Sequence, residues 1–559
     1  MDSSAVQRAM GRLLAKDQMI RPFFAPFWIL GPPPKDTKPV KSYDVGESRV
    51  SIFHMPESYE HLYWLSPPSF ELPDHELALL SDAIDGIWSS VPQNLDLGNQ
   101  VQIRLHVKHQ AQNLLMAGLP RTMGKVERES RAQVLATILE RNAAGLGIIE
   151  TLLADTNVQD VYIDAPCDRT PIHLAVADAG AGRLHQRCIT NILMDHDGLK
   201  NLVSKLLLSS GKPFSERNPV LEIDLSEMNA RLTAIRPPLS PEGVAIALRR
   251  HSTNPWTLAK LVHHRSLTPL AAGLLSFLIE GNSTLLVTGS RGAGKSSLLG
   301  AMMFEFPACQ RVLVIEDTLE LPCRELQRLG FKVQSLHVQS AEGMTAEDAL
   351  RVSLRLGESA IVLGEVRGKE ARTLYEAMRV GTAGSSVLGT IHGSSSQSVF
   401  ERVVHDLGIP PPSFSATDVV IVAGLLRPRG SHNPRRRVVE ISELCKDTCD
   451  GRFAPLMKYS ITQDSLVETD TFQSGSSKIR DIANSWGLSY KEALSNIRIR
   501  AKVKSHIVDA ARRLGTRLLS TKLIAQSNAT FTSLLEEGYS DDDVLDRWKN
   551  WFDTRAEYA

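Results

Sequence analysis

The sequence lacks any apolar run long enough to cross a membrane. No segment approaches the roughly 18 uninterrupted apolar residues that a spanning helix needs. Residues 1–19 also lack the apolar core of a signal peptide and carry charges of both signs. These absences predict a cytoplasmic protein whose contact with a membrane, if it has one, is peripheral.

Cysteine is scarce and net charge is absent. Six cysteines are spread over 559 residues, and only Cys445 and Cys449 lie close together. Because no second pair completes a zinc site, we expect buried free thiols in a reducing compartment. Lysine plus arginine and aspartate plus glutamate both number 63, so the net charge is zero. This balance argues against a general nucleic-acid-binding surface, though not against a local basic patch.

The chain is too long for one hydrophobic core, and its residue pattern changes several times along its length. We expect five parts, in chain order: an N-terminal helix (2–20) and proline-rich linker within 1–42, a first α+β domain (43–130), a second α+β domain (131–255), an α/β domain with a β-rich end (267–460) and a helical extension (476–559). A short linker near residues 252–266 would join the α+β region to the α/β domain.

Apolar runs alternate with helical stretches between residues 267 and 423. We expect strands at 285–287, 312–315, 361–363, 387–391 and 419–422. This β-α-β rhythm is typical of a parallel sheet covered by helices on both faces. Upstream, short apolar and periodic segments predict strands at 50–53, 59–65, 160–163, 231–237 and 244–248, and helices at 74–88 and 196–208. The fold class is therefore α/β, preceded by α+β domains and followed by helices.

A glycine-rich loop after the first of these runs is the most specific pattern in the chain. Residues 289–296 read G-x-x-x-x-G-K-S, the Walker A or P-loop motif, between a predicted strand and a helical stretch at 296–304. Such a loop turns backbone N–H groups and a helix N-terminus toward phosphate oxygens. Lys295 would reach the β- and γ-phosphates, and the Ser296 hydroxyl would bind Mg²⁺. We expect a nucleoside triphosphate to contact Gly289, Ser290, Arg291, Gly292, Ala293, Gly294, Lys295, Ser296 and Ser297.

Three further strand ends in this region carry polar residues. Glu316 and Asp317 follow the second apolar run, Glu365 follows the third, and His392 follows the fourth. The carboxyl ends of parallel strands form the edge at which open α/β sheets bind ligands. One such carboxylate is more often a helix cap or an ion-pair partner, but three strand ends behind a P-loop favour a nucleotide site.

The order of these motifs resembles the type II/type IV secretion ATPase family, the motors of pilus assembly, secretion and conjugation. The resemblance rests on the P-loop, Ile-Glu-Asp-Thr at 315–318, Gly-Glu-Val-Arg-Gly at 364–368 and Thr-Ile-His at 390–392. It covers roughly residues 43–460, and the archaeal branch is the most similar. It implies a RecA-like ATPase domain and a PAS-like second N-terminal domain.

The same resemblance implies a biological role. The family consists of homohexameric motors that hydrolyse ATP with Mg²⁺ and dock on a polytopic platform protein at the inner face of the cell membrane. Pilin-like or secreted substrates would be moved indirectly, and the neutral net charge argues against nucleic acid as a direct partner. The cargo stays open among pilin, archaellin, secreted protein and DNA.

Charge suggests the roles of the strand-end residues. Glu365 would either hold Mg²⁺ through water or polarise the attacking water, and Glu316 is the competing candidate for that water. Asp317 would order the water or bind the metal through it, and His392 would sense the γ-phosphate. Arg367 would either pair with a carboxylate or touch the nucleotide.

Three arginines of the second N-terminal domain complete the expected site. The resemblance implies that Arg231, Arg236 and Arg249 reach the phosphates once that domain closes. The alternative is that these arginines cap a strand edge. Closure of one domain onto another would also convert hydrolysis into movement.

The sequence departs from the family pattern in a few places. Ser385 stands where another histidine often precedes His392, and Arg291 and Ala293 stand where threonine and serine are common. Neither P-loop change removes a backbone N–H. No tetracysteine zinc insert is present.

Two other segments suggest rival interpretations. Residues 482–489 resemble the opening of a helix-turn-helix, and the basic residues Arg498, Arg500, Lys502 and Lys504 follow. They indicate either DNA binding or, more simply, a helical bundle with a solvated basic face. Arginines within 427–437 would face anionic lipid, acidic loops of a membrane protein, or solvent. The rival functions are a nucleic-acid-dependent RecA-like ATPase, a conjugation-type translocation motor for DNA or protein, and a regulatory ATP switch.

Overall fold

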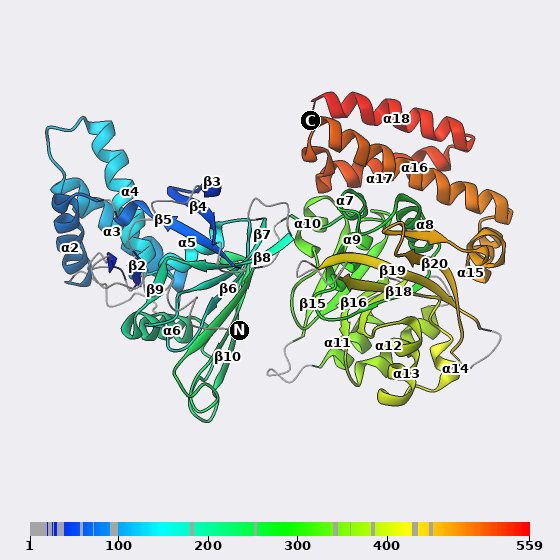
Figure 1. Ribbon diagram of the computed structural model, residues 1–559, viewed down its shortest axis with the longest axis horizontal. Helices are drawn as coiled ribbons and strands as arrows, with labels where there is room; N and C mark the ends of the chain where they lie inside the picture. Colours follow the sequence, from blue (N-terminus) through cyan, green and yellow to red (C-terminus); the bar gives the residue numbers. More distant parts are fainter. Residues whose placement is uncertain are drawn as a thin grey trace. The chain divides into compact units, whose positions relative to one another are not determined.

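The computed structural model forms two compact units, which meet in the sequence between Thr253 and Asn254 (Figure 1). It describes residues 19–20, 25, 27–30, 39–55, 60–70, 72–89, 99–178, 184–250, 254–338, 345–357, 359–381, 386–427, 434–446 and 451–558. The proline-rich linker at 31–35 and all but the end of the expected helix at 2–20 lie outside these residues. The helix is wrong for Met19–Ile20, which pair with a neighbouring strand instead. None of the described helices has the length and apolar character that crossing a bilayer requires.

The first unit is built on a nine-stranded sheet with the order β10-β11-β12-β6-β7-β8-β5-β4-β3. Its strands are β3 (Pro39–Val45), β4 (Ser48–His54), β5 (His61–Ser66), β6 (Val158–Ile163), β7 (His173–Asp178), β8 (Leu184–Thr190), β10 (Val220–Leu225), β11 (Ala230–Ile235) and β12 (Ala245–Arg250). Among these paired strands, β5 and β8 run parallel and the others antiparallel. Strands from both expected N-terminal domains thus share one sheet, and their division near residue 130 stays a prediction.

Helices and a small second sheet complete the first unit. The small sheet contains β1 (Met19–Ile20), β2 (Phe27–Leu30) and β9 (Ile192–Met194). The helices are η2 (Pro68–Phe70), α2 (Asp74–Ser89), α3 (Gln100–Gly118), α4 (Lys125–Ala143), α5 (Ile148–Ala154), α6 (His196–Ser210) and η3 (Ser226–Met228). Helices α2 to α4 share an apolar core of their own, whereas α5 and α6 pack on the large sheet.

The second unit is an α/β domain around another nine-stranded sheet, with the order β15-β14-β16-β17-β13-β18-β19-β20-β21. Its strands are β13 (Thr284–Gly289), β14 (Arg311–Glu316), β15 (Lys332–His337), β16 (Ala360–Val366), β17 (Val387–His392), β18 (Val419–Leu426), β19 (Arg435–Leu444), β20 (Phe453–Ser460) and β21 (Ser465–Glu468). Strands β13 to β18 pair in parallel, and β19 to β21 add an antiparallel margin. The predicted fold class is confirmed.

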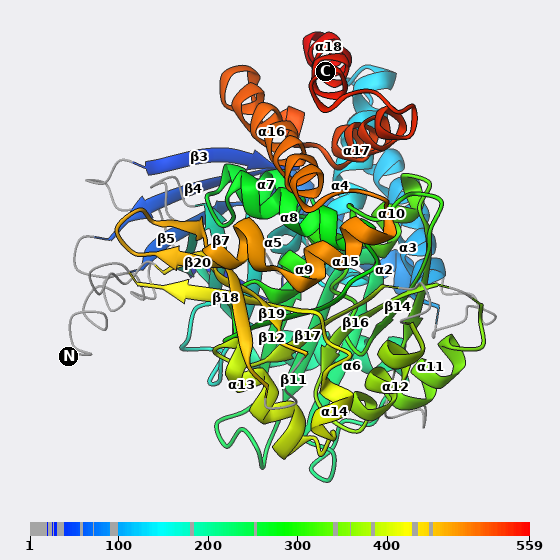
Figure 2. The same ribbon diagram turned by 90° about the vertical axis from the view of Figure 1, so that its right-hand side faces the viewer.

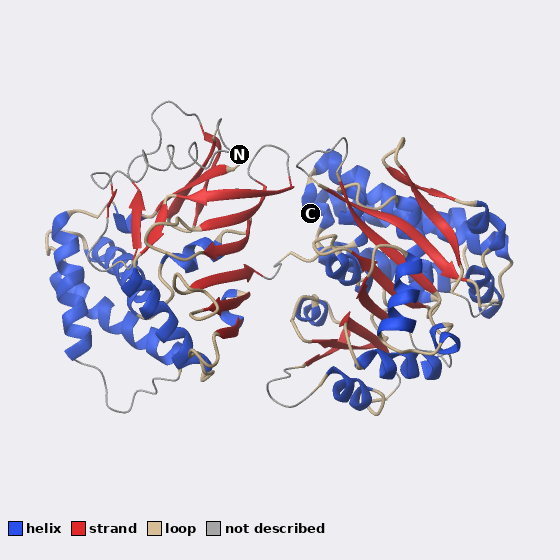
Figure 3. Cartoon of the chain, turned by 60° about the horizontal axis from the view of Figure 1, so that its bottom comes forward, coloured by secondary structure: helices blue, strands red, loops and turns tan. Residues whose placement is uncertain are grey.

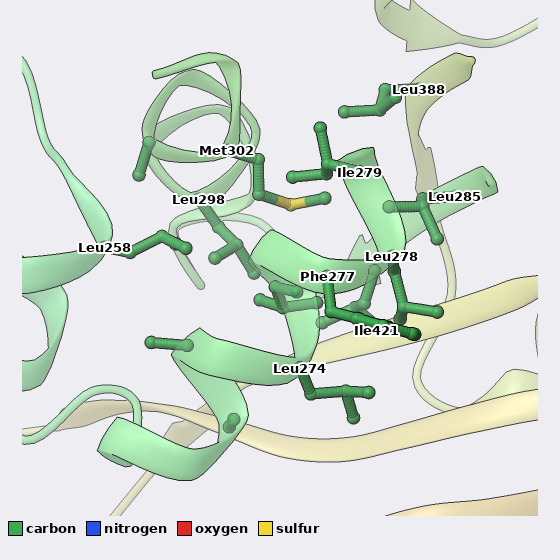
Figure 4. Packing of buried hydrophobic residues seen from close by; sticks show 14 of the residues in the cluster. Leu258, Leu274, Phe277, Leu278, Ile279, Leu285, Leu298, Met302, Leu388 and Ile421 are labelled. Carbon is green, nitrogen blue, oxygen red and sulfur yellow. The ribbon is translucent and has the colours of Figure 1, made fainter. Parts of the chain in front are cut away.

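Helices cover both faces of this sheet (Figure 3). They are α7 (Leu258–His263), α8 (Pro269–Glu280), α9 (Lys295–Met303), α10 (Cys323–Arg328), α11 (Ala346–Ser353), α12 (Glu370–Gly381), α13 (Ser396–Glu401), η5 (Arg402–Asp406) and α14 (Pro411–Phe414). On one face, side chains of α8, α9 and β13 meet in a dry cluster that includes Ile279, Met302 and Leu285 (Figure 4). The linker expected near 252–266 is wrong for residues 258–263, because α7 packs Leu258 and Leu261 into this cluster.

The helical extension packs on the same face of the second unit (Figures 1 and 2). It contains η7 (Thr471–Gly475), α15 (Ser477–Ser485), α16 (Tyr490–Leu514), η8 (Thr516–Leu519), α17 (Thr521–Glu536) and α18 (Asp541–Tyr558). Helix α16 crosses α8 so closely that a Cβ on Gly273 would lie 2.5 Å from the carbonyl oxygen of Ile497.

The close packing of α16 decides between the two interpretations of residues 482–489. Two of the basic residues that follow them are buried: Arg500 pairs with Glu280 at 2.5 Å, and Lys504 pairs with Glu305 at 2.7 Å. A recognition helix must offer an exposed face to the DNA major groove, and α16 uses this face inside the protein. The helical packing of the bundle interpretation is confirmed, but its solvated basic face is wrong for Arg500 and Lys504, which are buried. Arg498 and Lys502 are exposed, as that interpretation expects.

Candidate nucleotide-binding site

The P-loop connects the end of β13 to the start of α9, and its glycines occupy positions that other residues fit poorly. Gly289 has φ 151°, and a Cβ there would collide with the carbonyl oxygen of Ala423 on the neighbouring strand. Gly294 has φ 96° and directly precedes α9. The backbone therefore adopts the tight curl that the motif predicts, with the N-terminus of α9 at its end.

Lys295 is folded back over this loop. Its side chain is largely buried, and its Nζ donates to the carbonyl oxygens of Gly289 (3.1 Å) and Ser290 (3.3 Å). Burial lowers the pKa of Lys295, and the nearby carboxylate of Glu365 opposes this only in part. Among the described residues no carboxylate forms an ion pair with the ammonium group. The loop thus holds a desolvated cation, which suits an anionic ligand.

An irregularity in the sheet places Glu365 close to this lysine. Between β16 and β17 the register shifts, so that Gly364 and Glu365 stand opposite the single residue Thr390. Bulges of this kind re-aim a side chain. Oε1 of Glu365 lies 2.8 Å from Nε2 of His392, although the two groups are not aligned as a hydrogen bond.

His392 connects the carboxylate to the P-loop. Its Nδ1 lies 3.4 Å from Nζ of Lys295, while its Nε2 faces Glu365. Burial and the charge of Lys295 lower the pKa of His392, which keeps the imidazole neutral at physiological pH. Lys295, His392 and Glu365 thus form a chain of neighbours from the P-loop to the end of β16.

Glu316 has a different setting. It is 3% exposed, and its Oε1 accepts hydrogen bonds from the backbone N–H groups of Glu320 and Leu321, both at 2.9 Å. Burial raises the pKa of Glu316 to about 7, although the two hydrogen bonds oppose the shift. Its carboxyl group therefore closes the turn that follows β14.

Arg367 joins the two acidic strand ends. Its guanidinium donates to Oε2 of Glu365 and, at 3.3 Å, to Oδ2 of Asp317. Of the two roles expected for Arg367, the structure shows the pairing with carboxylates. Asp317 is half exposed on its side chain, in contrast to the buried Glu316 beside it.

These residues fit a nucleotide with a magnesium ion. The P-loop backbone and Lys295 match a polyphosphate, and the hydroxyl of Ser296 with the carboxylate of Glu365 offers the oxygen ligands that Mg²⁺ prefers. Within the described residues no three histidine, cysteine or acidic side chains gather as a metal cage. A nucleotide-bound Mg²⁺ needs no such cage, because phosphate oxygens and water supply most of its ligands.

The three predicted arginines lie in the first unit, and each has a partner there. Arg231 and Arg249 are register neighbours on β11 and β12. Arg231 pairs with Glu222 at 3.1 Å, and Arg249 pairs with Asp160 at 3.0 Å. Arg236 donates to the carbonyl oxygen of Phe214 at 3.1 Å. Their contact with a nucleotide stays a prediction.

The sequence analysis missed one arginine at the P-loop. Arg436, at the start of β19, donates through Nε to the carbonyl oxygen of Gly292 at 2.8 Å. In the sequence, Arg436 is one of several arginines in the basic segment at 427–437. The alternation of side chains along a strand was the signal that separates Arg436 from Arg435 and Arg437.

The second unit and part of the first match a known family. The family described as "Type II/IV secretion system protein" matches residues 142–476, which is more than half of the chain. A "Putative conjugal transfer protein MT3759" from Mycobacterium tuberculosis is 28% identical over 322 residues, or 56% of this chain and 88% of that protein. The "Uncharacterized protein MJ0781" from the archaeon Methanocaldococcus jannaschii is 27% identical over 247 residues, or 43% of this chain and 33% of that protein.

Among solved structures, that of the Legionella pneumophila ATPase DotB matches this chain. It is 18% identical, covers 64% of this chain and 88% of its own, and has a TM-score of 0.40. The archaeal relative agrees with the predicted similarity to the archaeal branch. Because the family match spans the four ordered motifs and the region before them, the chain belongs to the Type II/IV secretion system protein family.

Proposed function

We propose that this protein hydrolyses ATP at the P-loop of its second unit. The observation that carries the proposal is the chain of contacts from Lys295 through His392 to Glu365. It places a desolvated cation, a neutral imidazole and a carboxylate at the strand edge where the P-loop lies. A γ-phosphoryl group leaves through a transition state with charge on its oxygens, so positioning and positive charge are what such a site must provide.

Among the carboxylates, Glu365 is the better candidate to polarise the attacking water. Its Oε1 accepts no aligned hydrogen bond within the described residues, whereas Oε1 of Glu316 accepts two backbone hydrogen bonds. Asp317 and the Ser296 hydroxyl remain candidate ligands of Mg²⁺, which neutralises phosphate charge when it is bound. His392 would orient Glu365 and respond to the γ-phosphate.

We further propose that the protein works as a homohexameric motor. Membership of the secretion family supports this role, in which hydrolysis drives a polytopic platform protein at the inner face of the membrane. The machine would assemble a pilus-like or archaellum filament or export protein by a type II pathway. Arg231, Arg236 and Arg249 would supply positive charge to the phosphates on closure.

A second candidate function is a conjugation-type translocation motor for DNA or protein. It is favoured by the mycobacterial relative, which is named as a putative conjugal transfer protein. Both candidates use the same ATP chemistry and differ in their cargo.

The test combines the ATPase rate with the particle mass of the purified chain, with and without DNA. The secretion motor predicts Mg²⁺-dependent turnover without DNA and a mass of six subunits. The matched control is Lys295→Ala, which removes the P-loop cation and should abolish tight ATP binding and turnover together.

Two results would overturn the proposal. Turnover that appears only with DNA would favour a nucleic-acid-dependent motor. Turnover that persists in Lys295→Ala would show that the P-loop is not the site of hydrolysis.

A further inference from the structure

Three consecutive arginines begin β19, and the strand divides them between two faces. Arg435 and Arg437 point to one side, where both bind Asp464 at 2.9–3.0 Å. Arg437 makes the closer pair, with Nε on Oδ1 and Nη2 on Oδ2. This ion-pair network draws the pKa of Asp464 far below its usual range, chiefly through the Arg437 hydrogen bonds. The charges of Arg435 and Arg437 are thus engaged within the protein.

Arg436 projects to the opposite face, toward the P-loop. Strand β19 pairs with β18, which in turn pairs with the P-loop strand β13. Through this order, Nε of Arg436 reaches the carbonyl oxygen of Gly292 at 2.8 Å. Its Cδ lies 3.5 Å from the position that a Cβ on Gly294 would take. The arginine stem therefore runs along the loop that would bind the phosphates.

The described part of the chain places no carboxylate against the guanidinium of Arg436. Among the described residues it forms no ion pair, and its one hydrogen bond uses Nε and leaves both Nη groups for another acceptor. Burial lowers the pKa of Arg436, and no carboxylate offsets that effect. Arg436 is partly buried, and a partly buried guanidinium without a neighbouring anion favours a ligand that supplies one. Its planar fork matches the oxygens of a phosphate group.

We propose that Arg436 binds a phosphate group of the nucleotide, with Nε fixed to the P-loop at Gly292 and the Nη groups donating to phosphate oxygens. The contact comes from the same subunit, from the antiparallel margin of the sheet. The inference rests on the proposed ATP binding at the P-loop and adds a ligand to it. Arg436 would act on affinity for ATP and ADP alike, because it lies beside the loop and not beside Glu365.

Two variants separate the charge of Arg436 from its contact with the loop. Glutamine carries its Nε2 where arginine carries Nε, so Arg436→Gln keeps the donor to Gly292 and removes the charged end. Arg436→Lys keeps a positive charge and removes that donor. Arg435→Gln is the matched control, because it deletes the same charge from the other face of the same strand.

The measurement is the dissociation constant of a fluorescent ATP analogue and of the corresponding ADP analogue, each at low and high salt. We expect Arg436→Gln to weaken both by about 10–100-fold, the value of one or two hydrogen bonds to a charged group. Arg436→Lys should lose less, and Arg435→Gln should bind like the wild type. The affinity of Arg436→Gln should also depend less on salt.

Two outcomes would overturn the proposal while the wild type still binds ATP. Unchanged affinity in Arg436→Gln would show that the charge does not meet the nucleotide. A larger loss in Arg436→Lys than in Arg436→Gln would show that the residue only holds the P-loop carbonyl. If the wild type and Lys295→Ala bound ATP equally poorly, the nucleotide site itself would be wrong, and the inference would fall with it. Thermal unfolding of each variant checks that a loss of binding is not a loss of fold.

Discussion

The carboxyl ends of β14 and β16 carry the same residue type and have opposite environments. Glu316 ends β14 in a buried position, where two backbone N–H groups hold its carboxyl group. Glu365 ends β16 on a bulge, where His392 and Arg367 face it. The strands are hydrogen-bonded neighbours, so a single step across the sheet separates a carboxyl group held by backbone N–H groups from the one proposed to polarise water. The comparison teaches that the local backbone, and not the residue type, decides which carboxylate is available to a substrate.

The largest effect is expected when the charge of Glu365 is removed. Glu365→Gln removes the charge that would polarise water, so phosphate release should fall by about 10²–10⁴-fold, the usual contribution of a general base. ATP binding should persist, because Lys295 and the loop are unchanged. Stopped-flow phosphate release and equilibrium binding measure the two effects. Full activity in this variant would remove Glu365 from its assigned role.

Because the pKa of Glu316 is raised, we expect the free energy of unfolding to depend on pH. In the folded protein its pKa is about 7, against a usual value of 4.5, which corresponds to about 3 kcal/mol. Between these two pH values the folded state keeps a proton that the unfolded state has lost. This contribution to stability is therefore fully present below pH 4.5, declines as the pH rises, and is gone above pH 7.

Glu316→Gln is the control for that pH dependence, because its amide oxygen can accept the same hydrogen bonds without titrating. We expect the stability of the wild type relative to this variant to fall between pH 5 and pH 7.5, as measured by urea unfolding of both. Parallel pH profiles would mean that Glu316 is ionised in the folded state and resembles Glu365 after all.

Removal of the Glu316 side chain tests its structural role directly. At pH 5.5, Glu316→Ala leaves the N–H groups of Glu320 and Leu321 without an acceptor, at a cost of about 1–3 kcal/mol in the free energy of unfolding. Turnover should fall far less than in Glu365→Gln when both are assayed well below their melting temperatures. An activity loss equal to that of Glu365→Gln, with an unchanged melting temperature, would contradict the structural role of Glu316 and favour a catalytic one.

The smallest expected effect concerns His392, which stands between the two key charges of the site. His392→Gln removes one contact with Glu365 but no charge, so turnover should fall by about 2–10-fold, the value of one hydrogen bond. The catalytic rate at saturating ATP measures it. A loss as large as that of Glu365→Gln would make the histidine an equal partner in the chemistry.

The sequence predicted most of the second unit because its central strands are buried on both faces and read as apolar runs. Strand β15 escaped notice because it is an edge strand in which Val333 is the one core residue. Helix α7 escaped because six residues are too few to show a helical period. In the first unit, α4 has a polar composition that masks its buried side.

The candidate site was predictable where a motif names a residue and not where geometry assigns a role. The P-loop and the strand-end residues came from the motifs. The difference between Glu316 and Glu365 depends on a bulge in β16 and on the turn at 320–321. Neither feature has a recognisable pattern in the amino-acid sequence. Arg436 required knowledge of where β19 begins, since the face of a side chain follows from its register in the strand.

The close crossing of α8 and α16 has a consequence for how the protein is made. Every residue from Ala271 to Ile279 is buried, and α16 covers much of that surface although it follows long after in the chain. At a synthesis rate of about 5–20 residues per second, α8 leaves the ribosome on the order of ten seconds before its cover arrives. During this time the apolar surface of α8 lacks the cover that α16 gives it in the folded protein. A chain that ends before residue 476 would leave this surface permanently exposed, so the extension is needed for the second unit to keep its apolar core covered.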